Sequence, residues 1–325
     1  MYNQSAVGGF AGCATHPEVL LVVVVRTIFA HLDRRTVIRN TWAARHRIHG
    51  HVMQTVFLFT HVQAPVEASV LRESTIFGDV FHQFDEQDKV HANLTTKVRG
   101  AAQWVHAHCP QALFVMVSED NVVVDVHKLL PYLHRYRNQL SANTTLLCNI
   151  VTKDRPSEYF HAVHACQDDV FLAPTVVLDQ LWNAAETLVD LKGEEKITPV
   201  LSRLATAAGV SVGDMSPLFA GAVKKTSILK EFLGIGYHHS QVMVGMVPED
   251  YQGKEAAIMK HVWRVVQEHH TRTQIFNVYR AQFPPSGPHE TGNVQTMAMI
   301  LLGVDLIIVL LVFPFILWKK KCCRL

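Results

Sequence analysis

The chain has 325 residues, of which 49% are hydrophobic and 18% charged, and its 30 basic and 28 acidic residues leave a formal net charge of +2. With 16 Phe, 7 Tyr and 5 Trp it has ample apolar material for a core, which excludes disorder as its main state. The near balance of charge argues against a nucleic-acid partner, and six cysteines are too few for a disulfide-dense scaffold. One large α/β domain or two smaller domains would fit this length.

Apolar runs alternate with amphipathic segments along the first half of the chain, and the pattern weakens in the second half. The first expected helix has Asp33 as its N-cap. Because strands alternate with helices, we predict an α/β fold with a mostly parallel sheet, where ligands bind at the carboxyl ends of strands. Strands are expected at 20–26, 55–60, 79–84 and 112–117, and helices at 33–44, 66–74, 94–108, 126–140, 174–189, 199–208 and 255–269.

Residues 296–318 form one long apolar segment with a single charged residue, Asp305. At about 1.5 Å per residue, a helix of this length crosses a hydrocarbon core of about 30 Å. Trp318 ends the segment and the basic tail 319–325 follows, as is typical of a cytosolic flank. We therefore expect a transmembrane helix after a Pro-rich linker over 283–295, with a buried core helix as the alternative. Asp305 would face a partner helix or lie close enough to the interface to reach water.

The basic tail places the extreme C-terminus in the cytosol and the preceding domain in the lumen. Residues 1–17 show no signal peptide. Either the sequence begins after such a signal or carries one that is not recognisable, or the chain is tail-anchored with its domain in the cytosol. We favour the lumenal arrangement, in which Asn3, Asn93 and Asn143 begin acceptor sequences for N-glycosylation.

An acidic cluster follows the fourth expected strand. Glu119, Asp120 and Asn121 come directly after this apolar run, so they should lie at the carboxyl edge of the sheet. Their oxygens suit Mg²⁺ or Mn²⁺, and such an ion would in turn bind a diphosphate. A solvated acidic loop is the alternative interpretation of these three residues.

Several motifs in fixed order surround this cluster. The segment RRTVIRNTW at 34–42 resembles the RRxAIRxTW element of glycosyltransferase family 31, the β-1,3-galactosyltransferases and N-acetylglucosaminyltransferases. Further resemblances lie within about residues 20–135: TVFLF at 55–59, ES at 73–74 with FGD at 77–79, NLTTK at 93–97, Trp104 with CPQA at 109–112, and VSEDNVVVD at 117–125.

The resemblance implies a GT-A fold over residues 19–282, preceded by an N-terminal segment at 1–18. It implies a hexosyltransferase that moves a sugar from a UDP-sugar to a hydroxyl of a glycan or glycoprotein acceptor, in the Golgi membrane. It further implies Mn²⁺ at Glu119, Asp120 and Asn121. Asp120 and the three arginines of the first helix become candidates for binding the nucleotide, with surface ion pairs as the alternative for the arginines Arg34, Arg35 and Arg39.

The sequence also departs from the family pattern. The aspartate triplet is here Glu119-Asp120-Asn121, and the segment 165–171 has Asp168 where the family has a glycine. The family's catalytic base falls on 197–199, which contains no acid. Glu194 and Glu195 are weak candidates for a replacement base, and a solvated charged loop is the alternative. Two hypotheses follow: an active transferase, or a catalytically impaired relative that acts as a binding or chaperone-like partner. From the missing base and the Asp168 carboxylate we expect very weak or absent sugar transfer and only millimolar UDP binding.

The cysteines add one expectation. In the secretory lumen one disulfide bond is expected among Cys109, Cys148 and Cys166, with Cys13 outside the recognisable fold.

Overall fold

The computed structural model describes residues 13, 18–44, 46–59, 64–82, 94–139, 144–152, 164–187, 200–220, 242–248 and 253–282. The chain divides into two units, residues 1–268 and 269–325. The last helix, α8 (Glu255–Gln282), crosses this division, and only its first part, up to Glu268, is considered with the first unit.

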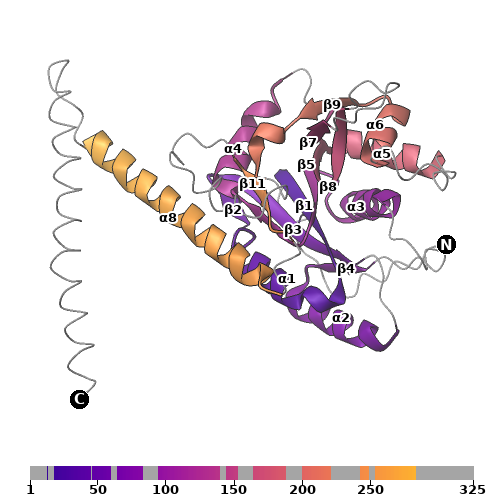
Figure 1. Cartoon of the computed structure of the whole chain (residues 1–325), viewed down its shortest axis with the longest axis horizontal. Helices are drawn as coiled ribbons and strands as arrows, with labels where there is room; N and C mark the ends of the chain where they lie inside the picture. Colours follow the sequence, from indigo (N-terminus) through magenta and orange to yellow (C-terminus); the bar gives the residue numbers. More distant parts are fainter. Residues whose placement is uncertain are drawn as a thin grey trace. The chain divides into compact units, whose positions relative to one another are not determined.

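A mixed eight-stranded sheet forms the centre of the first unit (Figure 1). Its strand order is β2-β3-β1-β5-β8-β7-β9, and β4 pairs with β3. The β1–β3, β1–β5, β3–β4 and β7–β9 pairs are parallel, whereas β8 runs antiparallel to both β5 and β7, and β2 antiparallel to β3. The strands are β1 (Val19–Thr27), β2 (Arg47–Ile48), β3 (His51–Phe59), β4 (Val80–His82), β5 (Ala112–Glu119), β7 (Thr145–Thr152), β8 (His164–Pro174) and β9 (Ser211–Asp214).

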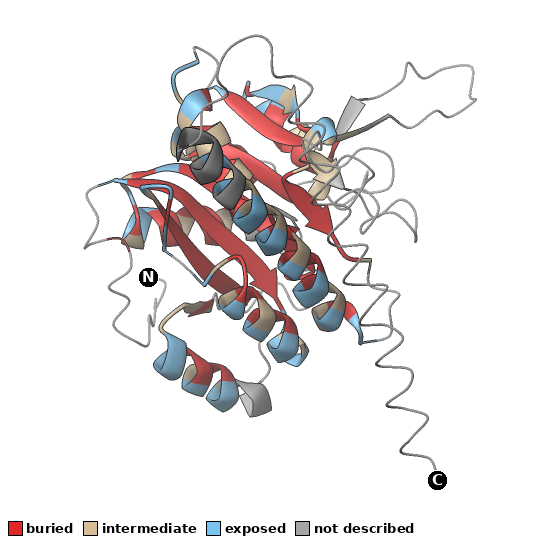
Figure 2. Cartoon of the chain, turned by 90° about the vertical axis from the view of Figure 1, so that its left-hand side faces the viewer, coloured by how far each residue is buried: buried red, intermediate tan, exposed pale blue. Residues whose placement is uncertain are grey.

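Helices cover both faces of this sheet, so its central strands are buried on both sides (Figure 2). Leu21, Val23 and Val25 of β1 belong to one apolar core, and Val22 and Val24 belong to the other. This alternation follows from the two-residue period of a strand. The first core includes residues of α1 (Leu32–Asn40), α2 (Ala64–Phe77), α4 (Val126–Tyr136) and the first part of α8, and the second those of α3 (Leu94–His108), α5 (Thr175–Thr187) and α6 (Val200–Ala207).

A three-stranded sheet continues from the carboxyl end of β5. Its order is β10 (Phe219–Ala220), β11 (Val244–Met246) and β6 (Val122–Val124), with β11 antiparallel to β6. Two short 3-10 helices, η1 (Phe29–His31) and η4 (Ser216–Leu218), lie in connections. The Trp42 indole Nε1 donates a hydrogen bond of 3.1 Å to the carbonyl of Val122, which fixes the end of α1 against β6.

The predicted α/β class and the parallel first half of the sheet are confirmed, and α3 has the predicted bounds. The predicted N-cap of the first helix is wrong: α1 begins at Leu32, so His31 is the N-cap and Asp33 lies in the first turn. No helix within the described residues is long and apolar enough to cross a membrane. The predicted transmembrane helix 296–318, the linker 283–295 and the tail 319–325 lie outside those residues.

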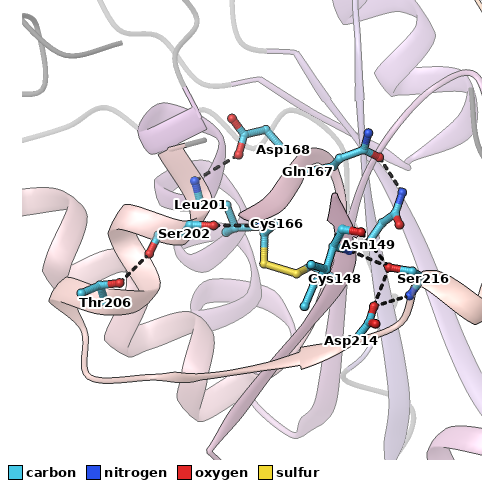
Figure 3. The surroundings of a disulfide bond; sticks show 11 residues. Cys148, Asn149, Cys166, Gln167, Asp168, Leu201, Ser202, Thr206, Asp214 and Ser216 are labelled. Atoms are coloured by element: carbon cyan, nitrogen blue, oxygen red, sulfur yellow. Dashed lines mark hydrogen bonds between the residues drawn. A yellow bond between two sulfur atoms is a disulfide. The ribbon is translucent and has the colours of Figure 1, made fainter. Parts of the chain in front are cut away.

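Two disulfide bonds form within the described residues, one more than the sequence predicts. Cys13, which was expected to lie outside the fold, is bonded to Cys109 at the end of α3 and is itself buried. The second bond joins Cys148 of β7 to Cys166 of β8 (Figure 3). All four cysteines belong to the core that includes residues of α3, α5 and α6.

The Cys148–Cys166 bond generates a stability prediction. It closes a loop of 18 residues by sequence separation. A loop of this length removes about 3 kcal/mol of unfolded-state entropy at room temperature in the chain-entropy model. We expect the double variant Cys148→Ser, Cys166→Ser to lose about that much free energy of unfolding in a urea titration. An unchanged midpoint would show that this bond does not form in solution.

Candidate functional site

The carboxyl ends of β1 and β5 bring an arginine and the acidic cluster together. These two strands are parallel neighbours, and Arg26 of β1 stands in register with Glu119 of β5. The Arg26 guanidinium forms an ion pair with the Glu119 carboxylate. The expected acidic edge of the sheet is thus present, with a cation from the neighbouring strand built into it.

Asp120, directly after β5, is held by three side chains from the β1–α1 connection. Its Oδ2 accepts a hydrogen bond of 2.6 Å from the Thr27 hydroxyl and lies 2.9 Å from His31 Nδ1. Its Oδ1 accepts a hydrogen bond of 2.9 Å from Arg34 Nη1. Asp120 is only 4% exposed, so both of its carboxylate oxygens are engaged in a nearly buried network.

Asn121 connects this edge to β11. Its side-chain Nδ2 donates a hydrogen bond of 2.8 Å to the carbonyl of Val247, and the Val247 N–H donates one of 2.9 Å to the carbonyl of Asn121. The side-chain Oδ1 is buried and has no hydrogen-bond partner among the described residues. Such an oxygen is an acceptor that a ligand could satisfy.

Arg26 likewise has a buried polar atom without a hydrogen-bond partner among the described residues, here a donor. It is 9% exposed, and its Nη1 is buried without a hydrogen-bond partner within the described residues. Burial lowers the pKa of this guanidinium to about 9, against the raising effect of the charges of Asp169, Asp120 and Asp168. Arg26 therefore remains a cation at neutral pH and has N–H groups suited to an anionic ligand.

The other two arginines of α1 lie in ion pairs with α2 and the turn before β4. Arg35 is fully buried and donates two hydrogen bonds, of 2.8 and 2.7 Å, to the carboxylate of Glu73. Arg39 donates two of 2.7 Å to Asp79, and its Nη2 also lies 2.8 Å from Glu73. Of the two interpretations of these arginines, the described contacts correspond to ion pairs, although the pairs are interior rather than superficial.

Arg35 is nevertheless connected to the acidic edge. Its Nη1 donates a hydrogen bond of 3.1 Å to the Thr27 hydroxyl, which in turn donates to Asp120. The same nitrogen donates one of 2.7 Å to the carbonyl of Ile28. Arg35 therefore holds the β1–α1 connection through Thr27 and Ile28, while Arg34 contacts Asp120 directly.

Asp168 has a structural partner rather than an open position. It lies on β8, and its Oδ1 accepts a hydrogen bond of 3.0 Å from the backbone N–H of Leu201 (Figure 3). Its Oδ2 accepts one of 3.3 Å from the backbone N–H of Val200. Burial raises the pKa of Asp168, although these two backbone hydrogen bonds act in the opposite direction. Its carboxylate thus caps the beginning of α6. The segment 188–199, with the candidate bases Glu194 and Glu195, lies outside the described residues.

The arrangement does not fit the expected Mn²⁺ as it stands. The Glu119 carboxylate is paired with Arg26, and both oxygens of Asp120 are taken by protein donors. In the part of the chain that the structure describes, no group of three or more metal-ligating side chains is placed to hold an ion. Binding at Glu119, Asp120 and Asn121 would require at least one arginine to release its carboxylate, and the ion stays a prediction.

The part of the chain that contains this acidic edge is similar to a known protein family. Residues 33–170 match the family model described as Galactosyltransferase. Over these residues the chain resembles the galactosyltransferase family. The match includes Arg34, the whole acidic cluster and Asp168, and it begins within α1, after Arg26, Thr27 and His31.

The curated relatives agree with this family. Beta-1,3-galactosyltransferase 4 of Rattus norvegicus is 34% identical over 128 residues, which are 39% of this chain and 33% of the relative. Beta-1,3-galactosyltransferase 5 of Homo sapiens is 36% identical over 110 residues, 34% of this chain and 35% of the relative. The human lactosylceramide 1,3-N-acetyl-beta-D-glucosaminyltransferase is 29% identical over 122 residues, 36% and 32% respectively. The chain thus spans about a third of the length of the curated relatives it matches.

Among solved structures, a glycosyltransferase involved in the glycosylation of the major capsid of PBCV-1 is similar to this chain. The sequence identity is 9% and the TM-score 0.39, over 74% of this chain and 99% of that one.

Sequence reasoning missed Arg26, Thr27 and His31 in this site. The missing information was the neighbour of the first strand: once β1 and β5 are paired in parallel, residues at the end of β1 meet the residues that follow β5. An Arg-Thr pair at the end of an otherwise apolar strand was the available indication.

The Glu73 carboxylate generates a second stability prediction. Replacing Glu73 by Gln leaves the guanidinium of Arg35 buried without its counter-charge, which costs about 3–5 kcal/mol for pairs of this kind. We expect a loss of that size in the free energy of unfolding measured with urea. Glu268→Gln is the matched control, because Glu268 is exposed and lies 3.9 Å from Arg264, a pair that should contribute at most about 1 kcal/mol. Equal losses in the two variants would contradict this role for Glu73.

The same carboxylate predicts a pH dependence. Burial by itself would raise the pKa of Glu73, but the hydrogen bonds and charges of Arg35 and Arg39 outweigh burial and hold it below its ordinary value of 4.5. The ion pair's contribution to stability is therefore fully present above pH 4.5 and is lost as the pH falls through the lower folded-state value. Urea midpoints measured across this range should fall more steeply in the wild type than in Glu73→Gln, and parallel curves would refute this.

Proposed function

We propose that the chain is a membrane-bound hexosyltransferase with a GT-A fold, which transfers a sugar from a UDP-sugar to a hydroxyl of a glycan or glycoprotein acceptor. The observation that carries the proposal is the galactosyltransferase-family match over 33–170. Within the matched residues, Arg34 and Asp120 form an ion pair at the carboxyl edge of the sheet. In open α/β sheets this is the edge where ligands bind.

The proposed reaction needs positive charge where the diphosphate leaves. The bond between the sugar's anomeric carbon and the diphosphate oxygen breaks, and a bond from that carbon to the acceptor oxygen forms. The acceptor hydroxyl loses its proton to a base, for which Glu194 and Glu195 remain the candidates. Arg26, with its unpartnered N–H group, is placed to donate to a phosphate oxygen, and charge of this kind stabilises the leaving UDP.

Mn²⁺ is the ion that the family resemblance implies, and it would supply further positive charge at the diphosphate. Its proposed ligands are Glu119, Asp120 and Asn121, of which Asn121 offers a buried oxygen without a partner among the described residues. Since Arg26 and Arg34 already compensate the two carboxylates, the chain's own cations compete with the ion for them.

A second candidate function is binding without turnover. The specific observation in its favour is that the acidic edge is charge-compensated by the protein and that Asp168 is used as a cap for α6. A relative of this kind would hold a nucleotide or a glycoprotein partner without transferring sugar.

The proposed location is the Golgi membrane, with the domain in the lumen and the C-terminus in the cytosol. The two disulfide bonds favour an oxidising compartment, since such bonds are rare in the cytosol. The transmembrane helix 296–318 and a helix partner at Asp305 are part of this proposal.

The proposal is tested by UDP binding and sugar transfer with the purified full chain. We expect UDP to bind, and Arg26→Gln to weaken that binding about 10- to 100-fold, because a hydrogen bond between charged groups contributes about 1.5–3 kcal/mol. Calorimetry measures the binding, with and without Mn²⁺ and a chelator. Arg264→Gln, a change at an exposed arginine of α8, is the control that should bind UDP normally.

The outcomes separate the two functions. Transfer from UDP-galactose, UDP-N-acetylglucosamine or UDP-glucose that is lost in Arg26→Gln supports the transferase. UDP binding without transfer supports the second function. Absence of UDP binding under every condition would overturn the transferase and the nucleotide-binding form of the second function.

A further inference from the structure

The turn between β2 and β3 contains an unusual residue. Ile48 pairs with His51, so His49 and Gly50 form a two-residue hairpin loop. Their φ angles are 50° and 84°, the sign that a type I′ turn requires at both positions. Asn, Asp and Gly are the usual residues there, and His49 is the non-glycine residue with positive φ among those described. Histidine tolerates positive φ better than most residues, but Asn, Asp or Gly is usual in such a turn, so its presence here suggests a use for its side chain.

The His49 side chain faces a second imidazole. Its Nε2 lies 3.4 Å from Nδ1 of His127, the second residue of α4. This separation is longer than a well-formed hydrogen bond between nitrogen and its acceptor. Two imidazole nitrogens that bind one tetrahedral Zn²⁺, each at about 2.0–2.1 Å, lie roughly 3.3–3.4 Å apart. The observed separation fits a long N–H···N hydrogen bond between the two neutral rings, and it also fits two nitrogens that share one metal ion.

The rigid surroundings of both rings favour a preformed pair. The ring of His127 stacks on the indole of Trp263, with centroids 6.0 Å apart and an interplanar angle of 13°. Trp263 is itself buried in the core between α8 and the sheet. His49 is exposed, and the two-residue turn of the hairpin fixes its backbone, so the two nitrogens come from different elements.

We propose that His49 and His127 bind a divalent metal ion that prefers imidazole ligands, and Zn²⁺ is the ion we propose first. In each ring the proton resides on the other nitrogen, Nδ1 of His49 and Nε2 of His127, so that the two facing nitrogens present lone pairs to the ion. Two protein ligands leave further coordination positions for water, because no third ligating side chain completes a group among the described residues. The ion joins the β2–β3 hairpin to α4.

This site is independent of the proposed transferase site. His49 precedes β3, whereas Asp120 follows β5, and both strands run parallel to β1. His49 therefore lies at the amino edge of the sheet and the acidic cluster at the carboxyl edge, while His127 lies at the start of α4, after β6. The ligand chemistry differs as well, since imidazole suits Zn²⁺ and carboxylate oxygens suit Mn²⁺.

The test titrates the purified full chain with ZnCl₂ alone and measures binding by calorimetry and the unfolding temperature by thermal scanning. The variants are His49→Asn and His127→Gln. His49→Asn is chosen because Asn accepts positive φ, so it should fold at least as stably as the wild type without metal. The control is His261→Asn, because His261 is an exposed histidine of α8 whose Nδ1 lies 2.9 Å from Arg264 Nη2.

We expect Zn²⁺ to raise the unfolding temperature of the wild type and of His261→Asn. Both site variants should bind Zn²⁺ at least about tenfold more weakly, which is the smallest effect that loss of even a supporting group has at metal sites. Mn²⁺ should not reproduce the effect. Equal Zn²⁺ affinity in all four proteins would assign the binding to other histidines and overturn the proposal, as would the absence of any Zn²⁺ response in the wild type.

Discussion

The buried ion pair between Arg35 and Glu73 is the interaction on which the rest of the site depends. Both guanidinium nitrogens that face the carboxylate are used, and Arg35 is fully buried under the ring of Phe59, 4.7 Å from its centroid. A guanidinium in such a place is stable only with its counter-charge. Because Arg35 also holds Thr27 and the carbonyl of Ile28, the pair fixes the connection that supplies the donors to Asp120.

The second feature of the site is that charges of both signs are packed together at one edge. Arg26 lies against Glu119, and Arg34 against Asp120 with Glu255 nearby. Each carboxylate therefore has an arginine of the protein as its counter-charge. In a metal-dependent enzyme the metal ion would be the counter-charge of such carboxylates. A diphosphate can enter such a network by drawing the guanidinium groups toward itself, whereas a divalent cation must displace them. The same side chains thus favour anionic ligands over cationic ones.

The parts of the fold that sequence could predict are those whose cause is local. The helix α3 and the central strands carry their own hydrophobic period, and the acidic cluster after β5 follows from the end of an apolar run. Strand β8 could not be predicted, because residues such as Gln167 and Asp168 interrupt its apolar pattern and its burial comes from pairing with β5 and β7. The roles of Arg35 and Arg39 were equally inaccessible, since their acidic partners lie 38 and 40 residues away.

The cap that Asp168 provides for α6 has a consequence for how this chain could change over evolutionary time. The family resemblance places a glycine at this position, where backbone approaches ligand. Here two backbone N–H groups at the start of α6, a helix from elsewhere in the sequence, donate to the Asp168 side chain. Replacing Asp168 by glycine would remove this cap, and the loss of a capping side chain costs about 0.5–2 kcal/mol. A glycine at this position would therefore be tolerated best together with a compensating change at the start of α6.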